Sequence, residues 1–225
     1  MSKAYELIVF DWDGTLMDSA ARIVTCIQRA AVDAGAPVPT PEEARDIIGL
    51  GLNEAIERLF PATEKSTTDA IVQAYRHHWL GNEIENEVMF EGAYRLVEHL
   101  YKNDILLAVA TGKSRRGLDK ALGDSGLGAF FHMTRCADET RSKPHPQMLT
   151  EILTDLNTPA AKAVVIGDTE YDMQMAVNAG VDAIGIAHGV HSLDRLLGSG
   201  AQQCFSDLIE LTAWLSDSLV PRMEV

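Results

Sequence analysis

Residues 6–19 read ELIVFDWDGTLMDS, an apolar run that continues directly into acid. The run from Leu7 to Phe10 is short and rich in strand-forming residues, which predicts a buried β-strand. Asp11 and Asp13 follow it at once. Two carboxylates this close repel each other, and one of them tends to take up a proton unless a neighbouring group offsets the charge. The stretch therefore predicts a core strand that ends in an acidic pair, whose compensating groups must come from elsewhere in the chain.

The length and composition are those of an ordinary globular protein with an acidic surface. The 225 residues are enough for one large domain or two modest ones, and 46% of them are apolar, which is enough for a sizeable core. The formal net charge is −14. An acidic surface repels nucleic acids and anionic membranes, because binding those polyanions requires basic patches. We therefore expect neither a nucleic acid nor a membrane as a partner.

The cysteines and the N-terminal region indicate a cytoplasmic, reducing environment. Cys26, Cys136 and Cys204 are odd in number, widely spaced and without a CxxC pair, which argues against a disulfide framework or a zinc site. Glu6 and Asp11 interrupt the apolar region that a secretion signal would need. The sequence also contains no uninterrupted apolar stretch long enough to span a bilayer.

Apolar runs and helical patterns alternate along most of the chain. Besides the first strand, four apolar runs predict strands: Ile105–Ala110, Met133–Cys136, Val164–Ile166 and Ala183–Ala187. Runs this apolar fit strands that are covered on both faces, and the segments between them carry apolar residues at helical spacing. Such alternation is typical of a parallel sheet with helices on both sides. We therefore predict an α/β fold with a Rossmann-like, doubly wound parallel sheet.

One interval, between the first and second predicted strands, breaks this alternation. It contains no convincing strand but several helices with clear start and stop signals. Ser19 is placed to cap the first of these helices, and Thr40, followed by proline and two glutamates, is placed to cap the second. We therefore predict an all-helical cap domain, residues 18–87, inserted into a catalytic core formed by residues 1–17 and 88–225.

Chemically active side chains follow the predicted strands at their carboxyl ends. In an open parallel sheet, ligands bind beyond this edge. The residues concerned are Asp11 and Asp13, Thr111 and Gly112, Lys143, Asp168 and Asp172. If the sheet is parallel, all of them meet at one edge, including Lys143, which precedes a predicted helix.

The chemistry of these groups is complementary. Asp11, Asp13 and Asp168 supply the oxygen ligands that suit Mg²⁺, which often uses one or two carboxylates together with substrate phosphate. Thr111 and the N–H groups of the turn after it can hold phosphate oxygens, since a helix N-terminus is a ready anion site. Lys143 can supply a positive charge. Carboxylates for a metal beside cationic and N–H groups for an anion indicate metal-assisted phosphoryl transfer.

Four short motifs resemble those of the haloacid dehalogenase superfamily, and within it the phosphoglycolate-phosphatase-like branch. DWDGT at residues 11–15 resembles its first motif, Thr111 with Gly112 its second, the KP pair at Lys143 its third, and GDTEYD at residues 167–172 its fourth. The order and approximate spacing match, and the resemblance covers nearly the whole chain. The predicted helical insert also lies where that branch carries a small helical cap.

The resemblance implies a role for each of the three aspartates that follow strands. Asp11 is expected to be the nucleophile, which forms an aspartyl-phosphate. Asp13 is expected to protonate the leaving oxygen and then to accept a proton from the attacking water. Asp11, the backbone carbonyl of Asp13 and Asp168 are expected to bind Mg²⁺.

The resemblance also implies which residues bind phosphate and which support the site. Thr111, Gly112 and Lys143 are expected to bind the transferring phosphoryl group. Thr15 and Asp172 are expected just outside these groups, with Asp172 orienting Lys143 or a water on the metal.

The cap loop is expected to help choose the substrate, because in this branch it faces the active site. The residues concerned are Arg45, Gly49, Leu50 and Gly51. The basic stretch KSRRG, residues 113–117, predicts a solvated helix start rather than a basic patch, since three charges are few in so acidic a chain.

The resemblance implies a phosphatase that hydrolyses a small phosphorylated metabolite, such as phosphoglycolate or a sugar phosphate. The second acid, Asp13, disfavours the halide-releasing branch, and the only lysine of the insert, Lys65, lies in a polar connection, which argues against the phosphonate-cleaving branch. A phosphomutase of the same superfamily and a non-catalytic binding or regulatory module remain as alternatives. The sequence does not identify the substrate and predicts no oligomeric state.

Overall fold

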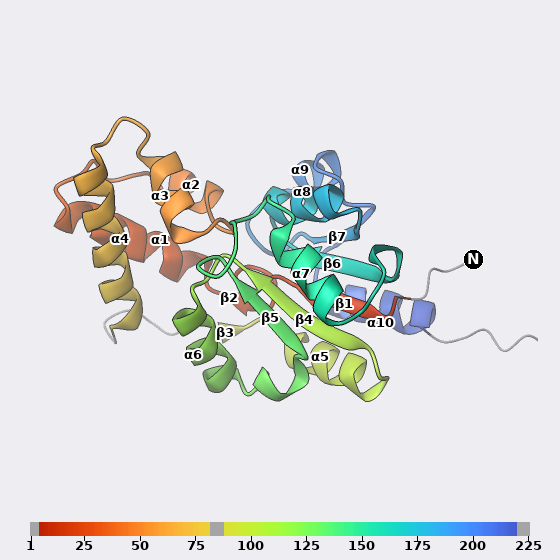
Figure 1. Ribbon diagram of the computed structural model, residues 1–225. Coiled ribbons are helices and arrows are strands. Elements are labelled where there is room, and N and C mark those ends of the chain that lie inside the picture. The colour runs from red at the N-terminus through yellow and green to blue at the C-terminus, as the bar shows by residue number, and fades with distance from the viewer. Residues whose placement is uncertain (1–4, 82–87, 220–225) are drawn as a thin grey trace, which may run out of the picture.

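The computed structural model describes residues 5–81 and 88–219, and its centre is a sheet of six parallel strands (Figure 1). The order of the strands is β5-β4-β1-β6-β7-β8. They are β1 (Leu7–Phe10), β4 (Leu106–Thr111), β5 (Met133–Cys136), β6 (Ala163–Gly167), β7 (Asp182–Ile186) and β8 (Gln203–Phe205). A separate antiparallel pair joins β2 (Met17–Asp18) to β3 (Val88–Met89).

Strand β1 lies in the middle of the sheet, paired with β4 on one side and with β6 on the other. Its four residues are at most 1% exposed. Because successive side chains of a strand point to opposite faces, Ile8 and Phe10 join one hydrophobic cluster and Leu7 and Val9 join the other. The uninterrupted apolar run therefore reflects burial on both faces of the sheet.

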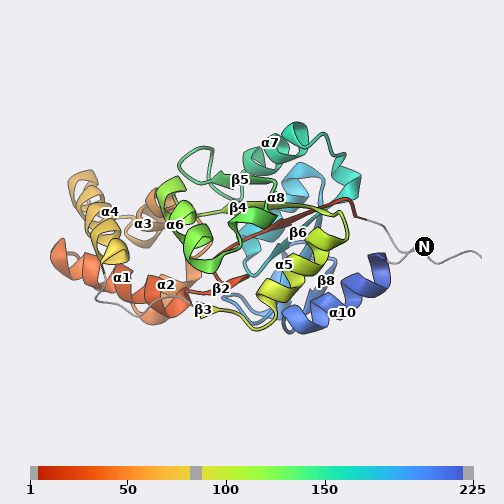
Figure 2. The same ribbon diagram turned by 90° about the horizontal axis from the view of Figure 1, so that it is seen from below.

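Helices cover both faces of the sheet, so the core has three layers (Figure 2). One face packs against α5 (Ala93–Lys102), α6 (Arg115–Ser125) and α10 (Leu208–Leu219), and the other against α7 (Gln147–Asp155), α8 (Glu170–Ala179) and α9 (Leu193–Gly198). Short 3₁₀ helices span Gly128–Phe130 and Ala160–Lys162. Within residues 5–81 and 88–219, none of the helices combines the length and apolar character needed to cross a membrane.

The predicted fold class, an α/β fold with a doubly wound parallel sheet, is confirmed. The five strands predicted from apolar runs are β1, β4, β5, β6 and β7. Strand β8 was not predicted, because its three residues begin with glutamine and are too few to show a pattern. The same reason applies to β2 and β3, which have two residues each.

Between β2 and β3, the described residues form four helices, which lie as a separate group beside the sheet (Figure 1). They are α1 (Ala20–Asp33), α2 (Pro41–Asp46), α3 (Leu52–Leu59) and α4 (Lys65–Leu80). These helices bury apolar side chains in two clusters made almost entirely of their own residues. The predicted domain boundary at residue 87 lies outside the described residues, so the division at 18–87 stays a prediction.

Candidate active site

Three neighbouring strands bring the predicted aspartates and the threonine to one edge of the sheet. Asp11 follows β1, Thr111 ends β4, and Asp168 follows β6. Because β4, β1 and β6 are parallel and adjacent, their carboxyl ends lie side by side. This placement follows from the topology of the fold and is the edge where ligands of such sheets bind.

The centre of the site is a buried cluster of three carboxylates and one lysine. One carboxylate oxygen from each of Asp11, Asp168 and Asp172 lies within 4.8 Å of the others, and all three residues are at most 1% exposed. Lys143 Nζ lies 2.7 Å from Asp11 Oδ1 and 2.6 Å from Asp172 Oδ1. Lys143 thus joins the aspartate after the first strand to the aspartate in α8. An interaction with Lys143 was one of the two roles predicted for Asp172.

Asp172 is fixed by the first turn of its own helix. Thr169 caps α8, and its backbone N–H and its hydroxyl donate to Asp172 Oδ2 at 3.1 and 2.6 Å. Gly167 makes room for this turn, since a Cβ at that position would overlap the Asp172 carboxylate. The other oxygen, Oδ1, is therefore left for Lys143.

Asp168 is held by residues from two other loops. The hydroxyl of Thr15 donates to Asp168 Oδ1 at 2.7 Å, and the N–H of Val190 donates to Oδ2 at 2.8 Å. Gly14 and Gly189 close over the same carboxylate, and a Cβ at either position would overlap it. Gly14 also has a φ of +82°, which favours glycine. Thr15 thus lies beside the acid cluster, where the sequence predicted a supporting residue.

Burial and mutual repulsion shift the pKa values of the cluster. Burial raises the pKa of Asp11 well above its ordinary value, and the charges of Asp172 and Asp168 raise it further, against a lowering by Lys143. Burial raises the pKa of Asp168 to about 7, and the charge of Asp172 adds to this effect. Burial alone would lower the pKa of Lys143, but Asp11 and Asp172 outweigh it, so this pKa is raised.

The residues of the cluster fit a divalent cation. Three buried carboxylates share a single lysine, so the cluster carries excess negative charge that buried groups rarely tolerate. Asp11 Oδ2 is buried and has no hydrogen-bond partner among the described residues. A set of hard oxygen donors with an unused lone pair is suited to Mg²⁺. The side chain of Asp13, in contrast, lies outside this cluster.

Asp13 has its own set of partners on the other side of the strand end. Ser19 Oγ donates to Asp13 Oδ1 at 2.6 Å, and Lys113 Nζ lies 2.8 Å from the same oxygen. Ser19 occupies the predicted N-cap position of α1, but its side chain accepts no capping hydrogen bond. Its hydroxyl points to Asp13 instead, so the predicted cap is a residue of the site.

Lys113 was predicted to belong to a solvated helix start, and this prediction is wrong. Lys113 is only 8% exposed, and it precedes α6, which Ser114 caps. Besides its pair with Asp13, its Nζ lies 4.2 Å from the ring centroid of Trp79 in α4. Burial between an aspartate and an aromatic ring thus places this charge in the site rather than in solvent. Position alone was a signal for it, because Lys113 follows the end of β4 directly.

The cap loop lies against the loop after β4, which was predicted to bind phosphate. A Cβ on Gly112 would overlap the backbone carbonyl of Leu50 and approach that of Gly49. The N–H of Gly51 donates to Ser142 Oγ at 2.7 Å, which ties the loop to the residue before Lys143. Three of the four cap residues predicted to face the active site therefore do lie against its loops.

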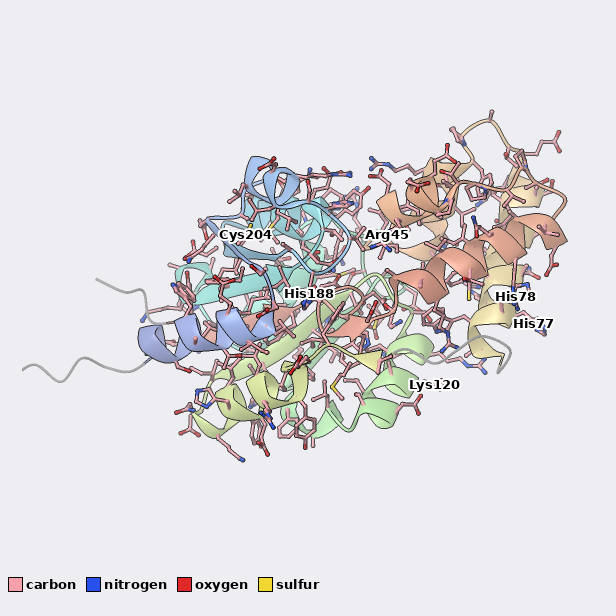
Figure 3. The ribbon with its side chains drawn as sticks, turned by 180° about the vertical axis from the view of Figure 1, so that it is seen from behind. Arg45, His77, His78, Lys120, His188 and Cys204 are labelled. Carbon is pink, nitrogen blue, oxygen red and sulfur yellow. The ribbon has the colours of Figure 1, made fainter. Side chains whose placement is uncertain are left out.

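Arg45, the fourth of these cap residues, meets the core on another side of the site, at the loop that closes over Asp168. Its guanidinium reaches the carbonyl of Gly189 at 3.5 Å, where the cap meets the core (Figure 3), and it is not among the residues that line the cavity described below. Nearby, Arg195 in α9 pairs with Asp46 in α2 and with Glu170 in α8. Arg45 and Arg195 thus hold the cap to the core beside the site.

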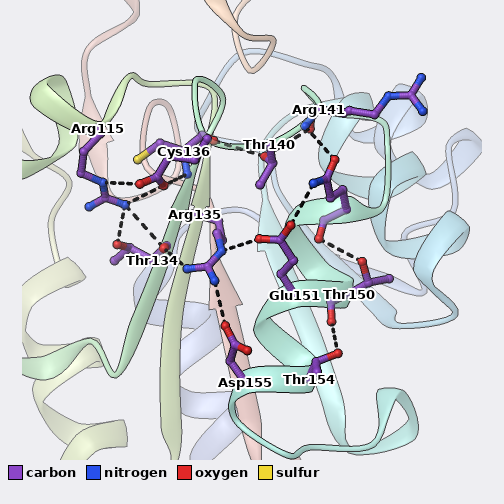
Figure 4. Close-up of polar contacts among 12 residues, drawn as sticks. Arg115, Thr134, Arg135, Cys136, Thr140, Arg141, Thr150, Glu151, Thr154 and Asp155 are labelled. Atoms are coloured by element: carbon purple, nitrogen blue, oxygen red, sulfur yellow. Dashed lines mark hydrogen bonds and ion pairs between the residues drawn. The ribbon is translucent and has the colours of Figure 1, made fainter.

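The loop after β5 is braced by a network of ion pairs and hydrogen bonds (Figure 4). Arg115 binds Glu139 through Nε at 3.0 Å and Thr134 through its Nη2 at 2.8 Å. The N–H of Arg141 donates to Gln147 at 3.1 Å, and Gln147 in turn donates to Glu151 at 2.8 Å. These contacts fix both ends of the loop that leads to Lys143.

A cavity of about 430 Å³ lies between the cap and the core, and both Asp11 and Asp13 line it. Gly112 and Lys113 line the same side, and cap residues from α1, α3, α4 and the loop of residues 47–51 line the rest. A space of this size admits a small organic ligand. The two aspartates therefore face one ligand site from two different environments.

Comparisons with known proteins find hydrolases and phosphatases of similar sequence and fold. A family model described as haloacid dehalogenase-like hydrolase matches residues 8–186. The probable phosphatase IndB of Dickeya dadantii is 31% identical over 90% of this chain and 91% of that protein. The phosphoglycolate phosphatase of Colwellia psychrerythraea is 27% identical over 92% of this chain and 95% of that protein. In fold, the chain is similar to the crystal structure of a predicted phosphatase from Clostridium acetobutylicum, with a TM-score of 0.86 and 23% identity over 95% of this chain and 99% of that one.

Proposed function

The chain belongs to the haloacid dehalogenase-like hydrolases, and we propose that it is a Mg²⁺-dependent phosphatase that hydrolyses a small phosphomonoester through an aspartyl-phosphate. Relatives named as phosphatases support the class of enzyme. One observation supports the mechanism most directly. Asp11 lies in the acid cluster with Lys143, whereas Asp13 lies outside it with Ser19 and Lys113, and both face one cavity.

In the first step, a carboxylate oxygen of Asp11 attacks phosphorus, and the bond from phosphorus to the leaving oxygen breaks. Asp13 donates a proton to that oxygen, so the product leaves as an alcohol. Thr111, the N–H groups after it and Lys143 hold the phosphoryl oxygens while this happens. The buried, lysine-paired position of Asp11 fixes the direction of attack.

In the second step, Asp13, now ionised, accepts a proton from a water molecule that attacks the phosphorus of the aspartyl-phosphate. The bond from phosphorus to Asp11 breaks, and phosphate and the free carboxylate are restored. Ser19 and Lys113 hold the Asp13 carboxylate for both proton transfers. The cap loop at Leu50 covers the site, which limits the entry of other water.

Mg²⁺ would be held by Asp11, Asp168 and the backbone carbonyl of Asp13, with Asp172 adjacent. When bound, it supplies positive charge that offsets the carboxylates and the phosphoryl oxygens. Thr15 and Val190 then serve to orient Asp168.

The test is phosphate release from p-nitrophenyl phosphate with and without Mg²⁺. We expect Asp11→Asn to lower kcat by about 10⁴-fold or more, since the loss of a nucleophile removes the covalent route. Asp124→Asn is the matched control, because Asp124 is an exposed residue of α6. Mass spectrometry of acid-quenched protein should find one phosphoryl group on Asp11 during turnover. Full activity of Asp11→Asn would refute the assigned nucleophile.

The same assay separates the alternatives. A phosphomutase of the same superfamily would isomerise a sugar phosphate without releasing phosphate. A non-catalytic module would bind phosphorylated ligands without turnover. A small phosphorylated metabolite as the partner, without nucleic acid or membrane, and a cytoplasmic location remain predictions from the sequence.

A further inference from the structure

The cavity above Asp11 and Asp13 has an apolar interior. Its buried lining comes mainly from the cap, and the side chains concerned are apolar or aromatic: Ile23, Ile27, Ile47, Ile48, Ala55 and Trp79. The half-buried Tyr75 extends this lining along α4, with its ring stacked on that of Trp79 at 5.9 Å between centroids. The buried part of the cap wall is therefore mainly hydrocarbon and ring surface.

Apart from the half-buried Tyr75, whose hydroxyl is polar, the polar side chains that the cap and α6 add to the lining are exposed. Asn53, Glu54 and Arg76 on the cap and Arg116 on the core are all exposed. All four line the cavity, and Glu54 carries a charge opposite to that of the two arginines. The buried cation of the lining, Lys113, is bound to Asp13 at 2.8 Å. Among the described residues, the buried side chains that the cap adds to the lining thus include no cation for a second anionic group.

The physical cost of each substrate class follows from this lining. The carboxylate of phosphoglycolate would lose its water against isoleucine side chains, and an unpaired charge is costly to bury. The hydroxyl groups of a sugar would lose hydrogen bonds in the same way. An uncharged apolar group instead gains free energy on leaving water for this wall.

We infer that the substrate is a phosphomonoester whose leaving group is an uncharged alcohol with a large apolar part, rather than glycolate or a sugar. This inference rests on the proposed function, since it places the phosphate on Asp11. The apolar part occupies the space beside Ile27, Ile47 and Tyr75, and any polar end of it contacts the exposed polar residues of the lining.

The test compares 2-phenylethyl phosphate with ethyl phosphate, which have similar ester oxygens and differ in the ring. We expect kcat/KM to be at least about tenfold higher for the phenylethyl ester, because an apolar group that fills an apolar pocket typically contributes this much or more. Phosphoglycolate and glucose 6-phosphate should be no better than ethyl phosphate. Equal values for the two alkyl esters, or a clear preference for phosphoglycolate, would overturn the inference while leaving the phosphatase function intact.

Binding provides a second measurement that does not depend on turnover. 2-Phenylethylphosphonate and ethylphosphonate cannot be hydrolysed at the ester position, so calorimetry gives their Kd values directly. We expect a Kd at least about tenfold lower for the phenylethyl compound. If no ester is hydrolysed, the proposed function fails, and these two Kd values still decide whether the pocket selects an apolar group.

A matched pair of variants locates the effect. Tyr75→Ala should bring the phenylethyl-to-ethyl ratio of kcat/KM close to one, because it removes part of the apolar wall. Tyr94→Ala is the control, since Tyr94 is an exposed residue of α5 outside the cavity, and it should keep the wild-type ratio. An unchanged ratio in Tyr75→Ala would show that the ring does not bind there.

Discussion

The cavity lies between two regions that are built in opposite ways. On the core side is the buried cluster of Asp11, Asp168, Asp172 and Lys143, which we call the floor, and on the cap side are the cap residues that line the cavity, which we call the roof. On the floor, buried charges form ion pairs, as Lys143 does with both Asp11 and Asp172. On the roof, the buried cap side chains among the described residues of the lining are isoleucine, alanine and aromatic ones, and the buried cation that they meet is Lys113, which lies against Trp79. The floor can hold one kind of group in one orientation. The roof can accept any apolar group that fits.

This difference teaches where chemistry and selectivity reside in the fold. The groups that we propose to react, Asp11 and Asp13, follow the central strand of the sheet. Most of the cap residues that line the cavity are on helices, where an apolar side chain that faces a ligand is of the same type as one that packs in a core. Substitutions can alter the floor itself or break a contact between the cap and the core.

The largest effect is expected when the charge of the floor is unbalanced. Lys143→Met leaves Asp11 and Asp172 buried without their cation, and breaking a buried ion pair in this way typically costs about 3–5 kcal/mol. Urea unfolding at pH 7.5 measures this loss. The difference from wild type should shrink at pH 5, because the unpaired carboxylates can then take up protons.

Lys120→Met is the matched control for that variant. Lys120 is half-exposed on α6 and pairs with the exposed Asp124 (Figure 3). Such surface pairs contribute about 0–1 kcal/mol, so the change in unfolding free energy should be small. Similar losses in the two variants would mean that the floor is not the tightly coupled cluster described here.

Metal binding is expected to stabilise the floor. Mg²⁺ at a concentration of about 100 times its Kd should raise the free energy of unfolding by about 2.7 kcal/mol, because it binds the folded cluster. Thermal unfolding with Mg²⁺ and with EDTA measures this difference. Asp168→Asn should lose most of it, and the exposed Asp124→Asn should keep it. Equal stabilisation of both variants would place the metal elsewhere.

The contact between floor and roof can be broken at one glycine. In Gly112→Ala the new Cβ would overlap the carbonyl of Leu50, so the cap loop must move away from the phosphate loop. Overpacking of this kind costs about 1–3 kcal/mol, and a cost of that size in the closed state predicts a loss of kcat/KM of about fivefold to 150-fold.

The control for this variant is Gly123→Ala. Gly123 lies in α6 with open space around it, and alanine favours helices, so activity should be unchanged and stability slightly higher. Wild-type activity in Gly112→Ala would show that the cap loop does not approach this closely during turnover.

The smallest effect concerns the contact of cap and core through Arg195. Hydrogen bonds from Arg195 lower the pKa values of Asp46 and Glu170. A lowered carboxyl pKa adds stability above the unfolded-state value, near pH 4, and that stability is lost as the pH falls through the folded-state value. Arg195→Gln should therefore differ from wild type at pH 6 by less than about 1 kcal/mol, since both pairs are partly exposed.

The pH dependence makes this last prediction specific. The difference in unfolding free energy between wild type and Arg195→Gln should shrink as the pH falls below about 4 and should vanish once both carboxyl groups are protonated in the folded protein, as measured by denaturant unfolding across the acidic range. A difference that does not shrink as the pH falls would mean that Arg195 acts through packing rather than through its charge.

Most of the core could be predicted because each local sequence pattern was compatible with only one common structure. Leu7–Phe10 is apolar throughout because the strand is covered on both faces, and no other common structure requires that pattern at this length. Asp168 and Asp172 were predictable because parallel strands bring their carboxyl ends to one edge. Strand β8, in contrast, is too short for any periodic signal.

Residues whose local sequence fits two different roles, one structural and one in the site, could not be assigned in this way. Ser19 fits a helix cap by position, yet its hydroxyl donates to Asp13. Lys113 lies in a basic stretch and has the sequence neighbours of a solvated lysine, yet the cap buries it on Trp79. Arg45 is in the predicted cap segment but reaches Gly189. In each case the partner is distant in sequence or on another element.

The sequence by itself determined the parallel sheet, which chemically active side chains follow which strand, and the single residue that separates Asp11 from Asp13. Those features depend on short-range patterns and on a topology that such patterns imply. Only the tertiary structure decided that Lys143 joins Asp11 to Asp172, that Lys113 holds Asp13, and that the roof is apolar. The physical reason is that charge pairing and cavity lining depend on which side chains meet across the fold, and helical periodicity does not distinguish a face that lines a cavity from one that fills a core.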